Sequence, residues 1–294
     1  MTSTKRRGAI IVNAFWRGGD AGAEKIAAAL SSFGYSAPLI RGDEIGLTVG
    51  KGLLGSVSFD FAVFLDKDDH LARLLELAGV RLFNRAEAIR LSDDKMLTHI
   101  ALAPFLPQPE TVSSPLFFAG EDDPDLLRTI EEKLGYPVVV KKCFGAFGKQ
   151  VFLAKNREEL AALRRDLIKE PHIYQKYIEC GATDYRVITI GGEAVAAMKR
   201  NAVTPGEFRA NAELGGRGEA IALTPDLKEI AETASRVLGL EYAGVDLLWD
   251  GERHLVTEVN SNAHFKLIEE VTGVPLATLY AQYIAKTIEK GEKI

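Results

Sequence analysis

Two short apolar segments near the C-terminus, each carrying an acidic residue, constrain the fold and chemistry of this chain most. They read AGVDLLW and HLVTEVNSN, and the turn Asp250-Gly251 separates them. Two strand-like runs joined by Asp-Gly predict a β-hairpin. Because side chains alternate along a strand, Glu258 and Asn260 share one face, and Asp246 can lie beside them on the partner strand. The hairpin therefore predicts three oxygen ligands around one point, the ligand type that Mg²⁺ prefers.

The alternative is that these acids are exposed charges at a strand edge. Their neighbours argue against it, because carboxylates among apolar side chains are costly to bury unless a cation or hydrogen bonds compensate. Those neighbours are Val245, Leu247, Val256 and Val259. We therefore favour a metal site.

The length of 294 residues suggests two or three lobes rather than one core. A hydrophobic content of 47% with 26% charged residues is typical of a soluble globular protein. No run approaches the eighteen or so apolar residues needed to cross a bilayer. The opening MTSTKRRGAIIVNAF has a short apolar stretch and no small-residue cleavage site, so we expect a first β-strand there, not a signal peptide.

The cysteines, histidines and net charge narrow the class of protein further. Only Cys143 and Cys180 are present, far apart and without metal-ligand spacing, which favours a reducing cytoplasm. The five histidines form no ligand pair, so oxygen must carry any metal chemistry. A net charge of −5 without a basic tail argues against nucleic-acid binding. We expect no nucleic-acid and no membrane partner, and leave open whether the chain forms a homo-oligomer.

The first ninety residues alternate strand and helix. GAIIVNAF and FDFAVFL read as buried strands, and AGAEKIAAALSSFG and HLARLLELAGV read as helices. This order predicts a small parallel sheet covered by helices, with a ligand crevice beyond the carboxyl ends of its strands. Residues 13–17 and 66–69 should meet at that rim. The alternative is that they are ordinary loops or helix caps.

A cluster of prolines at positions 104, 107 and 109 then indicates a linker. After it, YPVVVKKCFGAFGKQVFLAKN reads as two strands around a glycine-bearing loop. Backbone N–H groups of Gly145 and Gly148 can approach phosphates closely. Lys141 leads into this loop and can bind the same phosphates. The alternatives are a plain hairpin and a surface lysine whose stem packs on apolar groups.

Two further segments suit a nucleotide. An extended Gln175-Lys176-Tyr177-Ile178 can hold an adenine by main-chain hydrogen bonds, although a plain strand is ordinarily the better explanation of such a segment. Arg209 and Asn211 lie two apart in the glycine-rich TPGEFRANAELGGRGEA. An arginine in such a loop suits developing phosphate charge, and a solvated loop is the alternative.

The order and spacing of these segments resemble those of ATP-grasp enzymes. The motifs are SDDKMLTH, PVVVKKCFGAFGKQV, YQKYIECGATDYRV, AAMKRNAVTPGEFRANAELGG, AGVDLLW and TEVNSN. The chain most resembles the RimK-like α-L-glutamate ligases, from about Asn84 to the C-terminus. The resemblance implies an α/β (α+β) ATP-grasp fold with three lobes: an N-terminal Rossmann-like pre-ATP-grasp domain (1–92), a central lid (93–184) and a C-terminal domain with the metal site (185–294).

The resemblance also implies roles for individual residues. ATP phosphates are contacted by Lys95 and Lys141, adenine by Lys176, Tyr177 and Ile178, and the nucleotide site includes the glycine loop (Gly145, Gly148) and Asp184. Arg209 and Asn211 match the Arg-x-Asn of the phosphate region, with Arg209 and Lys141 as the catalytic cations. Asp246, Glu258 and Asn260 match the metal ligands, for one or two Mg²⁺ ions, with Mn²⁺ as an alternative.

The chain departs from the family pattern at two places. Phe144 and Lys176 stand where the family usually has Glu. After the metal ligands, Asn-Ala-His-Phe-Lys-Leu (262–267) replaces a small and acidic segment that borders the acceptor pocket. The added charge of His264 and Lys266 would favour an anionic substrate group, with Arg17 as a second anchor. The alternative is that His264 packs in a turn and Lys266 is solvated.

The reaction that residues and resemblance imply is ATP-dependent ligation of a carboxylate to an amine through an acyl phosphate, with small-molecule or peptide substrates. Two alternatives stay open. One is an ATP-binding regulatory protein on the same fold. The other is a ligase of another ATP-grasp branch, such as dipeptide or D-alanyl-D-alanine formation.

Overall fold

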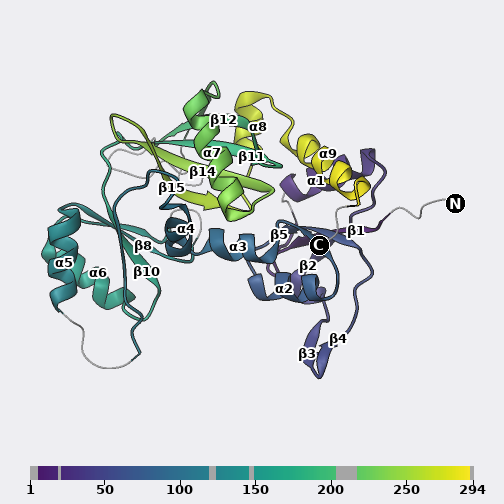
Figure 1. Ribbon diagram of the computed structural model, residues 1–294, viewed down its shortest axis with the longest axis horizontal. Coiled ribbons are helices and arrows are strands. Elements are labelled where there is room, and N and C mark those ends of the chain that lie inside the picture. Colours follow the sequence, from purple (N-terminus) through teal and green to yellow (C-terminus); the bar gives the residue numbers. More distant parts are fainter. Residues whose placement is uncertain (1–5, 19–20, 119–123, 146–148, 203–216, 292–294) are drawn as a thin grey trace.

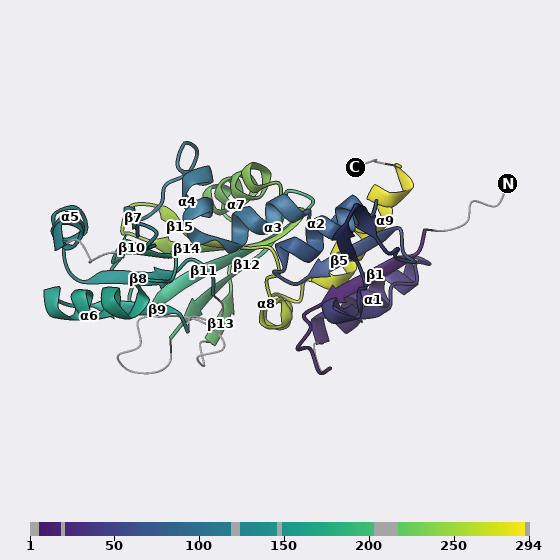
Figure 2. The ribbon, with the colours of Figure 1, turned by 90° about the horizontal axis from the view of Figure 1, so that it is seen from below.

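Strands in the described part of the chain form three sheets of four or five strands and one separate hairpin (Figure 1). The computed structural model describes residues 6–18, 21–118, 124–145, 149–202 and 217–291. Figure 2 shows the first and second sheets at opposite ends of the molecule and the third sheet between them. Among the described residues, no helix combines the length and apolar composition that crossing a bilayer requires.

The first sheet is parallel, with the order β2-β1-β5-β6. Its strands are β1 (Gly8–Val12), β2 (Leu39–Arg41), β5 (Phe61–Leu65) and β6 (Arg81–Phe83). All five residues of β1 are buried, as expected of a strand with both faces covered. Two helices pack with it, α1 (Ala21–Ser32) and α2 (Asp69–Leu77). The parallel sheet predicted for the first ninety residues is confirmed.

Two short elements lie between β2 and β5. A 3₁₀ turn, η1 (Gly42–Glu44), is followed by the hairpin of β3 (Thr48–Gly50) and β4 (Gly52–Leu54), which projects from the first sheet (Figure 1). At the start of α2, the side chain of Asp68 accepts a hydrogen bond from the Leu71 N–H at 3.0 Å. The helix-cap explanation is therefore the right one for Asp68.

The second sheet is antiparallel, with the order β7-β10-β8-β9. Its strands are β7 (Thr111–Ser113), β8 (Val138–Lys142), β9 (Val151–Ala154) and β10 (His172–Lys176). Two helices, α5 (Pro124–Leu134) and α6 (Arg157–Leu167), pack on it around the fully buried Ile130, Leu160 and Tyr174. Strands β8 and β9 flank the glycine-bearing loop as the sequence predicts.

The third sheet is antiparallel, with the order β13-β12-β11-β14-β15. Its strands are β11 (Thr183–Ile190), β12 (Glu193–Asn201), β13 (Arg217–Ala220), β14 (Tyr242–Trp249) and β15 (His254–Asn260). Val187, Val245 and Leu247 face helix α7 (Pro225–Leu238). On the opposite face, Ile188 and Ile190 pack toward α8 (Lys266–Thr272) and α9 (Leu276–Glu289). The remaining part of that opposite face carries Asp184, Arg186 and Asp246.

Two short helices connect the first sheet to the second, α3 (Ala86–Asp93) and α4 (Lys95–Leu102). Ala88 and Leu102 from these helices are buried in the core around α7. Asn84 precedes α3, and its amide donates to the carbonyls of Tyr242 and Ser261 at 2.8 and 3.0 Å. This buried amide is bonded to the first residue of β14 and to the residue after β15. It therefore holds the end of the first sheet against the third.

The sheets follow the division into 1–92, 93–184 and 185–294, except that β11 begins at Thr183. Packing crosses these boundaries: α1 packs on α9, and the core around them contains residues of both the first and the third sheet. We propose the three segments as the domains of the chain. Partial proteolysis and mass spectrometry of the fragments would test the boundaries.

Candidate functional site

The hairpin of β14 and β15 brings the predicted metal ligands together. Asp246 pairs directly with Glu258 across the two strands, and Asn260 pairs with Gly244. The register shifts just after Asp246, and Thr257 donates to the Asp246 carbonyl at 3.1 Å. Asp246 is 6% exposed. These positions put two carboxylates and an amide on one face of the sheet.

Two arginines hold Asp246. Arg186, on the neighbouring strand β11, forms a bidentate pair with it, and both distances are 2.7 Å. Arg200 on β12 approaches the same carboxylate at 3.2 Å. Burial opposes ionisation of Asp246, but the two guanidinium groups outweigh burial and lower its pKa. Asp246 is therefore ionised and oriented by charge-assisted hydrogen bonds.

Asp184 belongs to the same network. Arg200, which is 2% exposed, forms a bidentate pair with Asp184 at 2.6 and 2.7 Å. Burial raises the pKa of Asp184 even though Arg200 lowers it. Thus Asp184, expected at the nucleotide site, here holds Arg200, which in turn contacts Asp246. The sequence reasoning missed both arginines; the alternation that puts Arg186 on the face of Asp184, two residues away, is a signal that could have found one.

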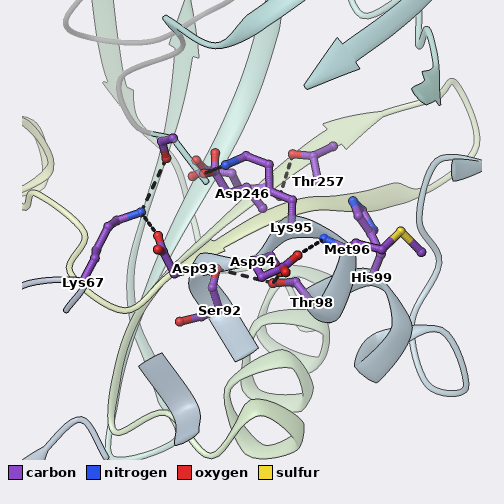
Figure 3. A network of polar contacts seen from close by, with 12 residues as sticks. Lys67, Ser92, Asp93, Asp94, Lys95, Met96, Thr98, His99, Asp246 and Thr257 are labelled. Atoms are coloured by element: carbon purple, nitrogen blue, oxygen red, sulfur yellow. Dashed lines mark hydrogen bonds and ion pairs between the residues drawn. The ribbon is translucent and has the colours of Figure 1, made fainter. Parts of the chain in front are cut away.

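Lys95 contacts Glu258 from the start of α4. The Lys95 ammonium lies 3.2 Å from Oε1 of Glu258, and the lysine is only 6% exposed. Asp94 caps the helix by accepting from the N–H groups of Met96 and Leu97. The Lys95 N–H donates to the Cys143 carbonyl at 3.2 Å. Figure 3 shows Asp94 and Lys95 at this helix start. The capped helix start thus joins Lys95 to the beginning of the glycine loop.

Lys141 on β8 lies in the same electrostatic environment. Burial of its ammonium lowers its pKa to about 8, and the Glu258 carboxylate counteracts this. Burial also opposes ionisation of Glu258, yet its pKa lies below the ordinary value because lysines stabilise the carboxylate. The lysines are Lys95, Lys141 and Lys67. A carboxylate surrounded by ammonium groups leaves positive charge available for an anionic ligand.

His99 is a buried neighbour that the sequence reasoning did not select. Burial and the charge of Lys141 lower its pKa to about 4, so it is neutral at pH 7. Its ring nitrogens contact the side-chain amides of Gln108 and Gln175. Gln175 also donates to Thr111 at 3.0 Å. His99 therefore connects α4 with the second sheet through neutral hydrogen bonds.

The described end of the glycine loop also meets the first sheet. Lys67, just after β5, forms an ion pair with Asp93 and lies 3.5 Å from the Gly145 carbonyl (Figure 3). A Cβ added at Gly145 would lie 2.9 Å from the Gln150 side chain, so a larger residue would require Gln150 to move. Gly148, Arg209 and Asn211 lie outside the described residues.

The expected adenine segment begins at Lys176, the last residue of β10. Lys176 is exposed and pairs with Glu110 at 3.1 Å, and its N–H donates to the Glu110 carbonyl at 2.9 Å. Tyr177 and Ile178 are half-buried. Burial raises the pKa of Tyr177. The Lys176 side chain thus interacts with the segment before β7, and its contact with a nucleotide stays a prediction.

The three residues expected on the substrate side are all exposed: Arg17, His264 and Lys266. Arg17 donates to the carbonyls of Ala14 and Trp16 at 3.1 and 3.0 Å, so its side chain bends back on its own loop. Lys266 begins α8. The segment after β15 and the end of β5 lie side by side, because the Asn262 side chain donates to the Leu65 carbonyl at 2.8 Å. Their role in substrate binding stays a prediction.

Comparison with known proteins places this geometry in a family. A model of the RimK-like ATP-grasp domain matches residues 92–284. Human N-acetylaspartylglutamate synthase A is 35% identical over 225 residues, covering 74% of this chain and 56% of the human protein. A probable α-L-glutamate ligase of Stutzerimonas stutzeri is 36% identical over 220 residues, covering 73% of this chain and 70% of that protein.

Solved structures agree on the fold. The crystal structure of a RimK domain protein of the ATP-grasp type from Sphaerobacter thermophilus matches with a TM-score of 0.74 at 21% identity, covering 94% of this chain and 98% of that one. The α/β ATP-grasp fold expected from the sequence is confirmed. The family expected from the motifs is confirmed as well: the chain belongs to the RimK-like ATP-grasp family.

Proposed function

We propose that this chain is an ATP- and Mg²⁺-dependent carboxylate–amine ligase that forms an amide through an acyl phosphate. The observation that carries the proposal is the juxtaposition of Asp246 and Glu258 across β14–β15 with Lys95 on Glu258. Carboxylates beside buried ammonium groups are what a site for a metal-bound polyphosphate requires. The family to which the chain belongs supports the same activity.

The residues present fit a Mg²⁺ ion. Glu258 Oε2 has no partner among the described residues, and Asp246 Oδ1 accepts from Arg186 alone there, which leaves it a second lone pair. The buried Nδ2 of Asn260 also has no partner in the described part of the chain. A buried N–H donor of this kind needs an acceptor, which a phosphate oxygen would supply, while the amide oxygen is the atom that could bind an ion. Asp246, Glu258 and Asn260 would hold one or two ions, with Mn²⁺ as an alternative.

A bound Mg²⁺ would neutralise phosphate charge near these oxygens. The chain's own cations have complementary tasks. Lys95 and Lys141 would bind the phosphates, and Lys141, whose pKa burial lowers to about 8, regains a favourable environment when an anion arrives. Arg209, with Asn211, would stabilise the transferring phosphoryl group. The glycine loop, including Gly145 and Gly148, would close on the phosphates, and residues 176–178 would hold adenine.

In the reaction, a carboxylate oxygen of the acid substrate attacks the γ-phosphorus of ATP, and the bond to the departing ADP breaks. The amine nitrogen then attacks the acyl carbon, loses a proton and expels inorganic phosphate. The products are an amide, ADP and phosphate. Arg17, His264 and Lys266 would contact the substrates from the rim, and both substrates are small molecules or peptides.

The test is product mass spectrometry after incubation with ATP, Mg²⁺ and pooled amino acids, dicarboxylic acids and peptides. We expect a product whose mass equals that of two substrates minus one water, formed with ADP in equal amount. Binding of ATP without product from any pool would favour a nucleotide-binding regulatory protein instead. A D-alanyl-D-alanine or other dipeptide product would place the chain's substrates with those of another ligase branch.

A further inference from the structure

Lys67 occupies a defined position between the first sheet and the centre of the site. It follows β5, at the carboxyl end of a parallel strand, where such sheets bind ligands. The Asp66 carboxylate accepts from the Lys67 N–H at 2.7 Å and from the Asn13 amide at 2.9 Å. Because Asn262 bonds to the Leu65 carbonyl, this strand end is also joined to the segment that leaves β15. The backbone of Lys67 is thus held beside the metal-ligand hairpin.

The ammonium of Lys67 has capacity left for a ligand. It has three N–H donors. One N–H points to Asp93. The ammonium nitrogen also lies 3.5 Å from the Gly145 carbonyl oxygen, at the outer limit of a hydrogen bond. The described residues supply no third acceptor. The side chain is 34% exposed, whereas that of Asp93 is 13% exposed. An incoming anion can therefore reach the ammonium while Asp93 keeps it oriented.

Electrostatics connect this ammonium to the predicted metal ligand Glu258. Lys67 is one of the three lysines that lower the pKa of Glu258. The other two approach from different elements: Lys95 begins α4, and Lys141 belongs to β8 of the second sheet. Lys67 is the one that comes from the first sheet. It therefore approaches the Glu258 carboxylate from a different sheet than Lys141 and from a different element than Lys95.

We infer that Lys67 is a specificity-determining residue whose ammonium binds a carboxylate of the acid substrate. This inference rests on the proposed function. An acid substrate is favoured over a nucleotide phosphate because the RimK-like match begins at residue 92 and contains the phosphate-site residues. Lys67 lies before that match and follows β5 of the first sheet, whereas the phosphate-site lysines Lys95 and Lys141 belong to α4 and β8. The acid substrate is thus anionic on the side that faces β5.

The experiment compares Lys67→Ala and Lys67→Gln with Lys67→Arg. The control is Lys51→Ala, an exposed lysine between β3 and β4. Each protein is loaded with Mg²⁺ and a non-hydrolysable ATP analogue and titrated by calorimetry with L-glutamate, L-aspartate and citrate. We expect at least one acid to bind the parent protein. The Ala and Gln variants should bind it about 10- to 100-fold more weakly, as expected for a charged hydrogen bond.

Lys67→Arg should stay within about 5-fold of the parent, because it keeps the charge but changes the donor geometry. Lys51→Ala should match the parent. Affinity for the ATP analogue alone should differ by less than about 2-fold among all variants. If Lys67 bound the nucleotide phosphates instead, the neutral variants would lose affinity for the analogue.

Three results would overturn the inference: no acid binding to the parent, equal acid binding by the neutral variants, or a loss confined to the ATP analogue. The proposed function is decided separately by product formation. A parent that makes no amide, but whose acid binding depends on Lys67, would refute the ligase and leave the anion site. If the parent makes an amide and the neutral variants bind the acid as tightly as the parent, the ligase stands and the anion site at Lys67 is refuted.

Discussion

The carboxylate network of the third sheet and the cations of the substrate rim lie in opposite environments. Asp246 and Arg200 are 6% and 2% exposed and are joined to each other and to neighbouring strands. Arg17, His264 and Lys266 are all exposed. In a buried network each charge depends on its partners, whereas exposed charges are screened by water and salt. The first region is therefore preorganised and costly to alter, and the second can change with little effect on the fold.

The largest effect should come from removing a buried charge of the network. Arg200→Met leaves Asp184 without its partner and Asp246 with only one, so the free energy of unfolding should fall by about 3 to 5 kcal/mol. Urea unfolding measures this change. The matched control is Arg165→Met, an exposed arginine on α6, which should change stability by less than about 0.5 kcal/mol. A loss below about 1 kcal/mol for Arg200→Met would mean that the network does not stabilise the third sheet.

The next effect concerns a metal ligand rather than a structural pair. Glu258→Gln keeps the shape but removes the charge, so ATP turnover should fall about 100- to 1000-fold, the scale of losing one strong electrostatic contact. The fold should persist, because Glu258 is 27% exposed and its only ion pair is with Lys95 among the described residues. ADP release and a thermal melt test both points. Turnover by the parent that survives EDTA would contradict the metal assignment.

Acid should reveal the buried histidine that joins α4 to the second sheet. His99 has a pKa of about 4 in the fold against 6.5 ordinarily, so the unfolded chain binds its proton first as the pH falls. The stability that neutral His99 maintains is complete above about pH 6.5 and is lost as the pH falls toward 4. The loss should total about 3 kcal/mol.

Unfolding by urea between pH 7 and pH 4 tests this slope. Burial also lowers the pKa of His172, so the parent carries a second contribution of the same sign. His99→Gln should therefore flatten the slope only in part. An unchanged slope in that variant would show that His99 does not titrate as described.

Lys141 tests the nucleotide side of the site. Lys141→Ala should weaken ATP binding about 10- to 100-fold, because a charged hydrogen bond to phosphate is lost. It should change the unfolding free energy of the ligand-free protein by less than about 1 kcal/mol, since burial already disfavours the ammonium. Calorimetry and urea unfolding measure the two quantities. Lys141→Arg should recover only part of the affinity, and equal affinity in all three proteins would return Lys141 to a surface role.

The smallest effects belong to the exposed rim. His264→Ala and Lys266→Ala should each raise the KM for the acid substrate about 2- to 5-fold, because exposed charge pairs contribute little. The KM for ATP should stay near its parent value. Steady-state kinetics with the substrates found by mass spectrometry measure both. If only the KM for ATP changes, residues 262–267 do not contact the acid substrate, and the search moves to residues 13–17.

Local patterns explain why much of the architecture was predictable. The alternation in β14 and β15 and the turn after Asp250 predict the hairpin, and Gly251 has the positive φ of 104° that glycine adopts readily. Helix α7 ends at Gly239, which has the left-handed φ of 70° that glycine adopts readily. These features depend on residues close together in the chain, so the sequence carries them directly. The register shift just after Asp246, which local patterns do not predict, puts Glu258 opposite it.

The partners of the acids were harder to predict. Arg186 and Asp246 are 60 residues apart, and Asp184 and Arg200 are 16 apart. The order of strands in the sheet decides which strand lies beside β14. That order is β13-β12-β11-β14-β15, so β14 pairs with β11 and not with β13, the strand that precedes it in the sequence. Composition and periodicity do not contain that order, so the guanidinium groups around Asp246 appear only in the folded protein.

The amino-acid sequence by itself determined the parallel first sheet, the glycine-bearing hairpin and the hairpin that carries Asp246 and Glu258, because short-range periodicity and turn chemistry encode them. Only the tertiary structure decided that Lys67 meets Asp93 and the Gly145 carbonyl, across 26 and 78 residues of chain. Such contacts arise where separately formed sheets pack together, and the buried apolar faces that set this packing specify no polar partner.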